Sequence, residues 1–136
     1  MKSISVYLDG TSKPNPGHCA YGIVLYDENN KLIEKSGAYL GMGTNNIAEY
    51  CGLIFGLVGV LKKNIKRATV YTDSLLMVKQ FKGEYKIKEE TLKKFNLIAK
   101  GIASLFEKLE IYHIPDVNNK EAHKVANSFL PESILE

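Results

Sequence analysis

The sequence predicts an α/β fold in which a mixed β-sheet carries helices on its faces. Two observations lead to this prediction. Strand-like alternation of apolar and polar residues covers residues 3–9, 20–26 and 31–40. From residue 47 onwards, helical stripes of apolar residues alternate with further strand-like segments. A hairpin start followed by alternating helices and strands is typical of a mixed sheet covered by helices. Because no linker or repeat divides the chain, we expect one domain over residues 1–136.

Turn-forming residues bound the first three predicted strands. Residues 10–17 read Gly-Thr-Ser-Lys-Pro-Asn-Pro-Gly, and we expect a loop there because glycine, proline and asparagine favour turns. Residues 27–30 read Asp-Glu-Asn-Asn, and asparagine tolerates the positive φ of a tight hairpin turn. Residues 41–46 are expected to form a polar loop before the first helix. The first three strands should therefore be sequential neighbours joined by short connections.

The second half of the chain predicts four helices and two strands. The helices are expected at residues 47–61, 74–81, 89–106 and 119–130, and the strands at residues 67–72 and 109–114. The first helix contains Gly52, Gly56 and Gly59, which lower its intrinsic helix propensity. We interpret these glycines as a sign that the backbone of this helix packs closely against another element.

Composition and charge exclude some classes of protein. With 45% hydrophobic and 24% charged residues, the chain has a globular rather than a disordered profile. The net charge is +3, and basic residues gather at 62–67 and 79–88, where they form either phosphate-binding clusters or ordinary solvated surface. Cys19 and Cys51 lie in apolar segments without metal-like spacing, which predicts two buried thiols, no disulfide and a reducing, cytoplasmic location. The absence of a signal peptide and of an apolar run of about 20 residues predicts no membrane association.

Three carboxylates occupy positions that favour a metal site. Asp9 and Asp73 are expected to end the first and fourth strands, and Glu49 lies near the start of the first long helix. Ligands gather at the carboxyl ends of parallel strands, so the three can meet. Close carboxylates repel one another unless a cation lies between them, and Mg²⁺ prefers oxygen ligands of this kind. Each acid also has a local explanation: Asp9 in a turn with Gly10, Glu49 in a capping box with Asn46, and Asp73 as a helix cap.

Three motifs resemble those of the type 1 ribonuclease H family. They are Asp9-Gly10 with Asn15-Pro16-Gly17, then Thr44-Asn45-Asn46-Ile47-Ala48-Glu49, then Tyr71-Thr72-Asp73-Ser74. The motifs occur in the order, spacing and predicted structural context of the family. The resemblance covers nearly the whole chain and ends at residues 119–127 in the last predicted helix. The combination of Asn-Pro-Gly with Thr-Asn-Asn-x-x-Glu is specific to this family, whereas Thr-Asp-Ser alone would not be.

The resemblance implies both a fold and an activity. The fold would be a five-stranded sheet in the order 3-2-1-4-5 with helices on both faces. The activity would be endonucleolytic cleavage of the RNA strand of an RNA–DNA hybrid, with two Mg²⁺ or Mn²⁺ ions and 5′-phosphate and 3′-hydroxyl products. Asp9, Glu49 and Asp73 would be the catalytic residues that hold metal, in a protein expected to be a monomer. The substrate-binding residues would be Gly10, Ser12, Asn15, Thr44, Asn45, Asn46 and Ser74.

Two positions depart from the pattern of the family. The family's fourth acid, in the last helix, aligns with His123. A neutral imidazole is a softer ligand than a carboxylate, so His123 is a candidate catalytic and metal-binding residue that would favour Mn²⁺ over Mg²⁺; alternatively it is a surface residue. Asp116 is a weaker candidate to replace the missing carboxylate, with Asn118 and Asn119 weaker still. The chain also lacks the N-terminal hybrid-binding module and the basic protrusion of some family members.

The leading hypothesis is therefore an active ribonuclease H. The alternative is a nucleic-acid-binding module of the same fold whose metal site is impaired because His123 replaces an acid. A third possibility is a nuclease of related fold that acts on other nucleic acids, and the Thr-Asn-Asn-x-x-Glu motif argues against it.

Overall fold

The computed structural model describes residues 1–132, which form one five-stranded sheet and several helices. The strands are β1 (Ile4–Lys13), β2 (Gly17–Asp27), β3 (Leu32–Gly43), β4 (Arg67–Thr72) and β5 (Lys108–His113). The α-helices are α1 (Asn45–Leu61), α2 (Leu75–Phe81), α3 (Glu90–Ala103) and α4 (Lys120–Ser128), and the short 3-10 helix η1 (Asp116–Asn118) precedes α4. Residues 133–136 of the predicted domain lie outside the described residues.

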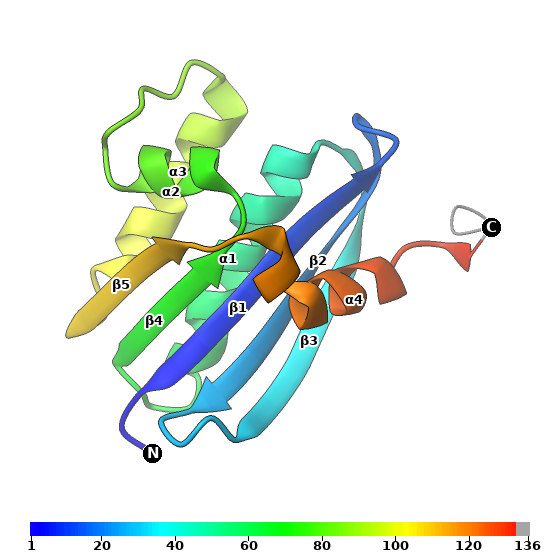
Figure 1. Cartoon of the computed structure of the whole chain (residues 1–136). Helices are drawn as coiled ribbons and strands as arrows, with labels where there is room; N and C mark the ends of the chain where they lie inside the picture. The colour runs from blue at the N-terminus through cyan, green and yellow to red at the C-terminus, as the bar shows by residue number, and fades with distance from the viewer. Residues whose placement is uncertain (133–136) are drawn as a thin grey trace.

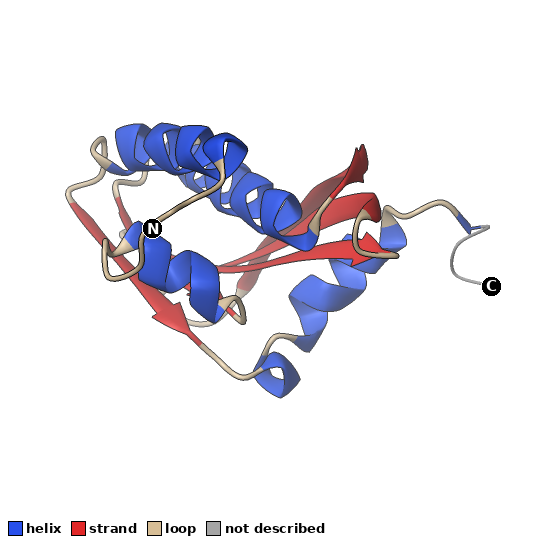
Figure 2. Ribbon diagram, turned by 90° about the horizontal axis from the view of Figure 1, so that it is seen from above, coloured by secondary structure: helices blue, strands red, loops and turns tan. Residues whose placement is uncertain are grey.

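The strand order is β3-β2-β1-β4-β5, which confirms the expected mixed sheet. β1, β2 and β3 are antiparallel neighbours, whereas β4 pairs in parallel with both β1 and β5. α1 packs on one face of β1 and β2, with α3 against its outer side, and α4 packs on β2 and β1 from the other face. Figures 1 and 2 show the resulting layers, with the sheet between α1 and α4. Helices therefore cover both faces, as expected.

The glycines of α1 bring this helix close to β1. A methyl group at Gly52 would lie 3.3 Å from the Leu8 side chain, and one at Gly56 would lie 3.1 Å from Val6. Leu8 and Val6 are completely buried in the core. A side chain at either position would require these strand side chains to shift by a few tenths of an ångström. The predicted close packing of α1 is confirmed at Gly52 and Gly56 but not at Gly59, where the nearest atom would lie 4.0 Å from an added methyl group.

The predicted loop at residues 10–17 is wrong. β1 continues to Lys13 and β2 begins at Gly17, so only residues 14–16 form the hairpin turn. The expected loop at residues 41–46 is also mostly structured, because β3 extends to Gly43 and α1 begins at Asn45. Turn-forming residues adopt an extended conformation here because a neighbouring strand satisfies their backbone N–H and C=O groups.

The pairing of β1 with its two neighbours ends at different places. The parallel pairing with β4 runs from Ile4 to Leu8, which lies opposite Thr72, whereas the antiparallel pairing with β2 continues to Lys13. Asp9 therefore lies within β1, and the prediction that it ends the strand is wrong. Because Asp9 and Asp73 both follow the last parallel pair, they lie next to each other at the carboxyl end of β4, although Asp9 is still paired with β2.

Two predictions from composition can be compared with the structure. Cys19 is buried as predicted, whereas Cys51 is only half-buried, and both thiols are free. Within residues 1–132, no helix combines the length and the apolar character needed to cross a membrane.

Candidate active site

The structure brings the three predicted carboxylates together. Asp9 comes from β1, Glu49 from α1, and Asp73 directly follows β4. One ligand oxygen from each lies within 4.8 Å of the others. Only 4% of Asp9 and 6% of Glu49 is exposed, and Asp73 is half-buried. The three acids line one wall of an open cleft of about 650 Å³.

None of the three local explanations for these acids holds in the structure. Thr44, not Asn46, caps α1, and its Oγ1 accepts a hydrogen bond from the backbone N–H of Ile47 at 3.2 Å. Ser74, not Asp73, caps α2 by accepting from Met77 at 3.2 Å. Asp9 lies in a strand rather than in a turn. The acids are therefore free of capping roles, and their meeting in one cleft needs a different cause.

Glu49 is held where β1 and α1 approach most closely. The Gly10 backbone N–H donates to the Glu49 carboxylate, and the Thr72 hydroxyl lies 3.5 Å from the same group. A methyl group at Gly10 would lie 2.3 Å from the Glu49 backbone nitrogen and 2.5 Å from the Ala48 carbonyl carbon. Only glycine fits this position, so Gly10 brings the strand into contact with the helix that carries Glu49.

Nearby positive groups do not balance the negative charge of the three carboxylates. Burial, and then the nearby Asp73 carboxylate, raise the pKa of Asp9 from 3.8 to about 6, although His123 opposes this shift. Burial, followed by the charges of Asp9 and Asp73, raises the pKa of Glu49 well above its ordinary value. Among the described residues, no lysine or arginine forms an ion pair with any of the three acids. Clustered, desolvated oxygens without a protein cation fit a hard divalent ion.

His123 lies against Asp9 rather than on a remote surface. Its Nδ1 is 2.9 Å from Asp9 Oδ2, and its Nε2 is 2.9 Å from the amide nitrogen of Asn127. Asp116 lines the same cleft from η1, but it lies outside the group of mutually close ligand atoms. The structure thus places both sequence-predicted candidates for the fourth position at the cleft. His123 contacts Asp9 but, like Asp116, lies outside the group of mutually close ligand atoms.

The two weaker alternatives for the fourth position do not line the cleft. Asn118 is exposed in η1 on the other side of this segment. Asn119 is buried, and its Nδ2 donates to the Leu8 carbonyl at 2.8 Å. Asn119 therefore fastens the start of α4 to β1 immediately before Asp9, which is a structural role.

Most of the predicted substrate-binding residues surround the same cleft. Gly10, Ser12, Asn45, Asn46 and Ser74 line it. The other two predicted residues, Asn15 and Thr44, stabilise the segments that line the cleft. Asn15, in the β1–β2 turn, accepts from the Asn45 backbone N–H at 3.1 Å, and Thr44 caps α1.

Sequence analysis missed two basic residues at the cleft. Lys120 and Lys124 line it from α4, on either side of His123 in the sequence. Their i, i+4 spacing around a candidate site residue places them on one side of the helix and could have been noticed. They provide the positive charge that an anionic ligand would meet at the rim.

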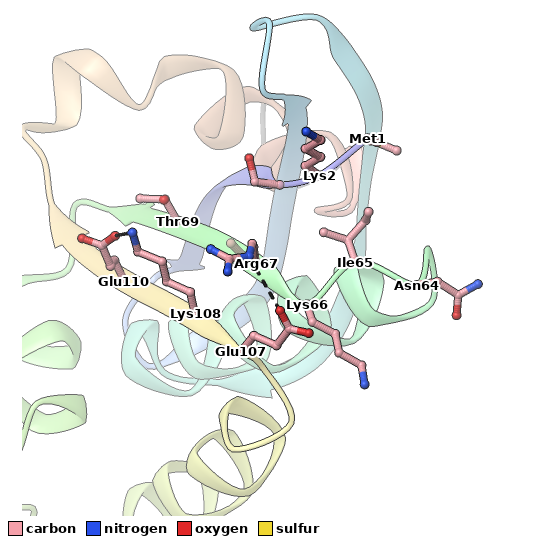
Figure 3. A pocket seen from close by; sticks show the side chains of 12 residues that line it. Met1, Lys2, Asn64, Ile65, Lys66, Arg67, Thr69, Glu107, Lys108 and Glu110 are labelled. Carbon is pink, nitrogen blue, oxygen red and sulfur yellow. Dashed lines mark ion pairs between the residues drawn. The ribbon is translucent and has the colours of Figure 1, made fainter.

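A larger cavity, of about 740 Å³, lies at the opposite end of the sheet, where β1, β4 and β5 begin. Figure 3 shows that charged side chains of both signs line it. Arg67 pairs with Glu107 at 3.7 Å, and Lys108 pairs with Glu110 at 3.6 Å. Part of the basic cluster at residues 62–67 therefore lies far from the acids. None of the predicted site residues lines this cavity.

Known proteins resemble the chain in sequence as well as in fold. The sheet order and the acidic cluster define a ribonuclease H-like domain. Residues 7–129 match the model of the family described as reverse transcriptase-like, and the chain belongs to this ribonuclease H-like family. The resemblance inferred from the motifs is thus confirmed.

Two curated relatives give the extent of the similarity. The chain is 35% identical over 125 residues to the bifunctional protein Rv2228c of Mycobacterium tuberculosis, covering 91% of this chain and 34% of that protein. It is 30% identical over 130 residues to ribonuclease HI of Halobacterium salinarum, covering 96% of this chain and 65% of that protein. The chain therefore spans about a third of the mycobacterial relative and about two thirds of the archaeal one.

Solved structures extend the comparison. Ribonuclease H1 of Halobacterium salinarum superposes with a TM-score of 0.91 at 30% identity, covering 93% of this chain and 96% of that chain. The compost-derived LC11-RNase H1, solved in complex with an RNA/DNA hybrid, superposes with a TM-score of 0.89 at 34% identity, covering 96% of this chain and 99% of that chain.

Proposed function

We propose that this protein is a ribonuclease H that hydrolyses the RNA strand of RNA–DNA hybrids. One observation carries the proposal: Asp9, Glu49 and Asp73 converge in one cleft, largely buried and without a lysine or arginine partner among the described residues. The likeness to ribonuclease HI and to a ribonuclease H1 solved with an RNA/DNA hybrid gives this acidic site a substrate.

Asp9, Glu49 and Asp73 would hold two divalent cations, Mg²⁺ or Mn²⁺, for which carboxylate oxygens are suitable ligands. Bound there, the ions would supply a water nucleophile and stabilise the attacking and leaving oxygens of the phosphodiester, which gives 5′-phosphate and 3′-hydroxyl ends. The protein contributes the spacing of its carboxylates, because Gly10 and Thr72 fix Glu49, and the contact between α1 and β1 places it beside Asp9.

The remaining residues of the cleft would bind and orient the hybrid. Asn45 and Asn46, at the start of α1, would donate to 2′-hydroxyls, base edges and phosphates without adding charge. Lys120 and Lys124 would contact phosphates electrostatically. Glu49 would accept a hydrogen bond from a ribose 2′-hydroxyl, the group that distinguishes RNA from DNA.

The alternative is a module that binds hybrids without cleaving them. The motif resemblance favours it, because it aligns His123 with an acid of the family. An RNA-labelled hybrid incubated with Mg²⁺ or Mn²⁺ separates the two functions. We expect cleavage by the wild-type protein, little cleavage of a matched DNA duplex, and none by Asp9→Asn. Cleavage that persists in Asp9→Asn would point to a contaminating nuclease, and binding without cleavage under both metals would favour the module.

Three further expectations stay proposals. Residues 1–136 would form one domain, a view that the single sheet with its continuous core supports. The protein would act as a monomer, which sedimentation velocity would test. The free thiols Cys19 and Cys51 are compatible with the reducing cytoplasm, and fractionation of the source cells would test that location.

A further inference from the structure

Both ring nitrogens of His123 are already engaged within the protein. Nδ1 lies 2.9 Å from Asp9 Oδ2, and Nε2 lies 2.9 Å from the amide nitrogen of Asn127. A neutral imidazole has one N–H donor and one lone pair. A cation could use the lone pair only if the partner that occupies it were displaced.

Asn127 determines which nitrogen carries the proton. Its Nδ2 lies 2.9 Å from the His123 backbone oxygen as well as 2.9 Å from the ring Nε2. An amide nitrogen has two hydrogens, so it can donate to both. The reversed amide would place its oxygen against the His123 carbonyl, where two acceptors would repel. Asn127 Oδ1, at the other end of the amide, is buried without a hydrogen-bond partner among the described residues. The arrangement makes Nε2 the acceptor and Nδ1 the donor to Asp9.

The packing of α4 sets the distance between His123 and Asp9. Gly22 lies directly opposite Asp9 in the pairing of β1 with β2. A methyl group at Gly22 would lie 2.4 Å from the Ala126 backbone nitrogen and 2.6 Å from the Ala122 carbonyl oxygen. Ala122 and Ala126 are fully buried and flank His123 along the helix. The helix backbone therefore rests on the sheet beside Asp9, and the ring of His123 reaches the carboxylate without a bridging group.

We propose that His123 is a positioning residue that holds Asp9 through Nδ1–H, and that Asn127 fixes the tautomer required for this hydrogen bond. This inference deepens the proposed function, since it takes Asp9 as a metal ligand. The hydrogen bond engages Oδ2 of Asp9 and directs the carboxylate toward the cation site. His123 then replaces the family's fourth acid in position but not in chemistry, because it does not bind the ions itself. Partners that orient a ligating carboxylate change metal affinity by about 10- to 100-fold.

The first experiment reads the tautomer of His123 directly. Long-range ¹H–¹⁵N NMR spectra of the uniformly ¹⁵N-labelled chain would be recorded metal-free and with saturating diamagnetic Mg²⁺, with His123→Gln used to assign the signals. We expect a protonated Nδ1 and an unprotonated Nε2 in both spectra, whereas the backbone amides of Gly10 and Glu49 shift on Mg²⁺ addition. A protonated Nε2, or a ring-nitrogen shift that shows Mg²⁺ ligation, would overturn the proposal.

The second experiment measures Mn²⁺ affinity by the EPR signal of free Mn²⁺. Asn127→Ala should weaken Mn²⁺ binding about tenfold and give a mixture of tautomers. Asn127→Asp, whose carboxylate accepts from Nε2–H, should place a proton on that nitrogen. Ser128→Ala is the matched control, because Ser128 lies on the same helix and, within residues 1–132, its hydroxyl bonds only the Val125 carbonyl. Unchanged Mn²⁺ affinity and tautomer in Asn127→Ala would contradict the proposal.

Neither experiment depends on cleavage, so the failure of this proposal and the failure of the proposed function give different results. Normal tautomer and Mn²⁺ results without hybrid cleavage would remove only the nuclease assignment. A wild-type protein that binds no Mn²⁺ would overturn both, because Asp9 would then not be a metal ligand.

Discussion

The two ends of the sheet carry charge in different ways. At the carboxyl end of β4, Asp9, Glu49 and Asp73 share a cleft with no lysine or arginine paired to them among the described residues. At the opposite end, charges of both signs pair on the surface, where their side chains are between 41% and 64% exposed. The larger cavity lies at the second end. The difference teaches that uncompensated buried charge, rather than cavity size, marks the candidate site.

Removing one charge from each end should have very different effects on cleavage. Asp73→Asn should lower the rate of hybrid cleavage at least about a hundredfold, because one oxygen ligand of the cation site is lost. Glu110→Gln, at the remote end, should leave the rate unchanged. Initial rates on an RNA-labelled hybrid at saturating Mg²⁺ would measure both. Equal cleavage rates for the two variants would contradict the conclusion that the acidic cleft, and not the opposite end of the sheet, is the active site.

Because α4 packs closely on the sheet beside the site, one added methyl group there should change the stability of the protein. Gly22→Ala should lower the free energy of unfolding by about 1–3 kcal/mol, since the new methyl group would collide with the backbone of α4. Gly101→Ala is the control, because nothing lies near this exposed helical glycine, and it should stabilise the protein by up to about 1 kcal/mol. Urea unfolding of both variants would measure the difference. Similar free energies of unfolding for the two variants would mean that α4 can shift to make room for the methyl group.

The raised pKa values of the site acids predict how the stability of the metal-free protein depends on pH. The pKa of Asp9 is raised to about 6 and that of Glu49 lies well above its ordinary value, so the folded protein holds these protons more tightly than the unfolded chain does. This contribution to stability is fully present below about pH 4 and is lost as the pH rises through about 6 and beyond.

In EDTA, the wild-type protein should therefore melt several degrees lower at about pH 8 than at about pH 5.5. Glu49→Gln should reduce this difference, because the amide has no charge to bury. Saturating Mg²⁺ at about pH 8 should raise the melting temperature of the wild-type protein. Differential scanning calorimetry would measure each case, and a wild-type protein that melts higher at about pH 8 would contradict the sign.

The smallest effect is expected at the remote end. Arg67→Ala removes an exposed pair with Glu107 at 3.7 Å, and such surface pairs contribute between about 0 and 1 kcal/mol. We expect a change of less than about 0.5 kcal/mol in the free energy of unfolding and none in cleavage. A clear loss of hybrid cleavage would instead assign a functional role to the larger cavity.

Periodicity predicted the type of each helix and strand and the bounds of β4, but most other boundaries differ from the predicted ones. The alternation of β1 and the stripe of α1 reflect burial on one face, which a single sequence records. The strand order 3-2-1-4-5 came from the motifs instead, because periodicity does not specify which strands are neighbours. The extension of β1 to Lys13 was missed because it depends on β2, whose backbone groups pair with a segment rich in turn residues.

The candidate site, like the fold, could be predicted only in part from the sequence. Asp9, Glu49 and Asp73 could be found because each is a charged residue that interrupts an apolar pattern or belongs to a recognisable motif. The capping roles of Thr44 and Ser74 shifted by one or two residues from the predicted ones, which is the usual uncertainty of helix ends.

Two residues that help to position the site side chains could not be predicted from the local sequence pattern. Asn127 matters only because the ring of His123 lies one helical turn away and points at Asp9. Gly22 matters only because α4 crosses β2 there. Both depend on contacts between elements that lie far apart in the sequence.

One hydrogen bond beside the cleft has a thermodynamic consequence for ligand binding. Asn15 Oδ1 accepts from the Asn45 backbone N–H at 3.1 Å and so joins the hairpin turn to the start of α1. The conformational entropy of this pair of segments is lost during folding, and association with a ligand need not restrict them again.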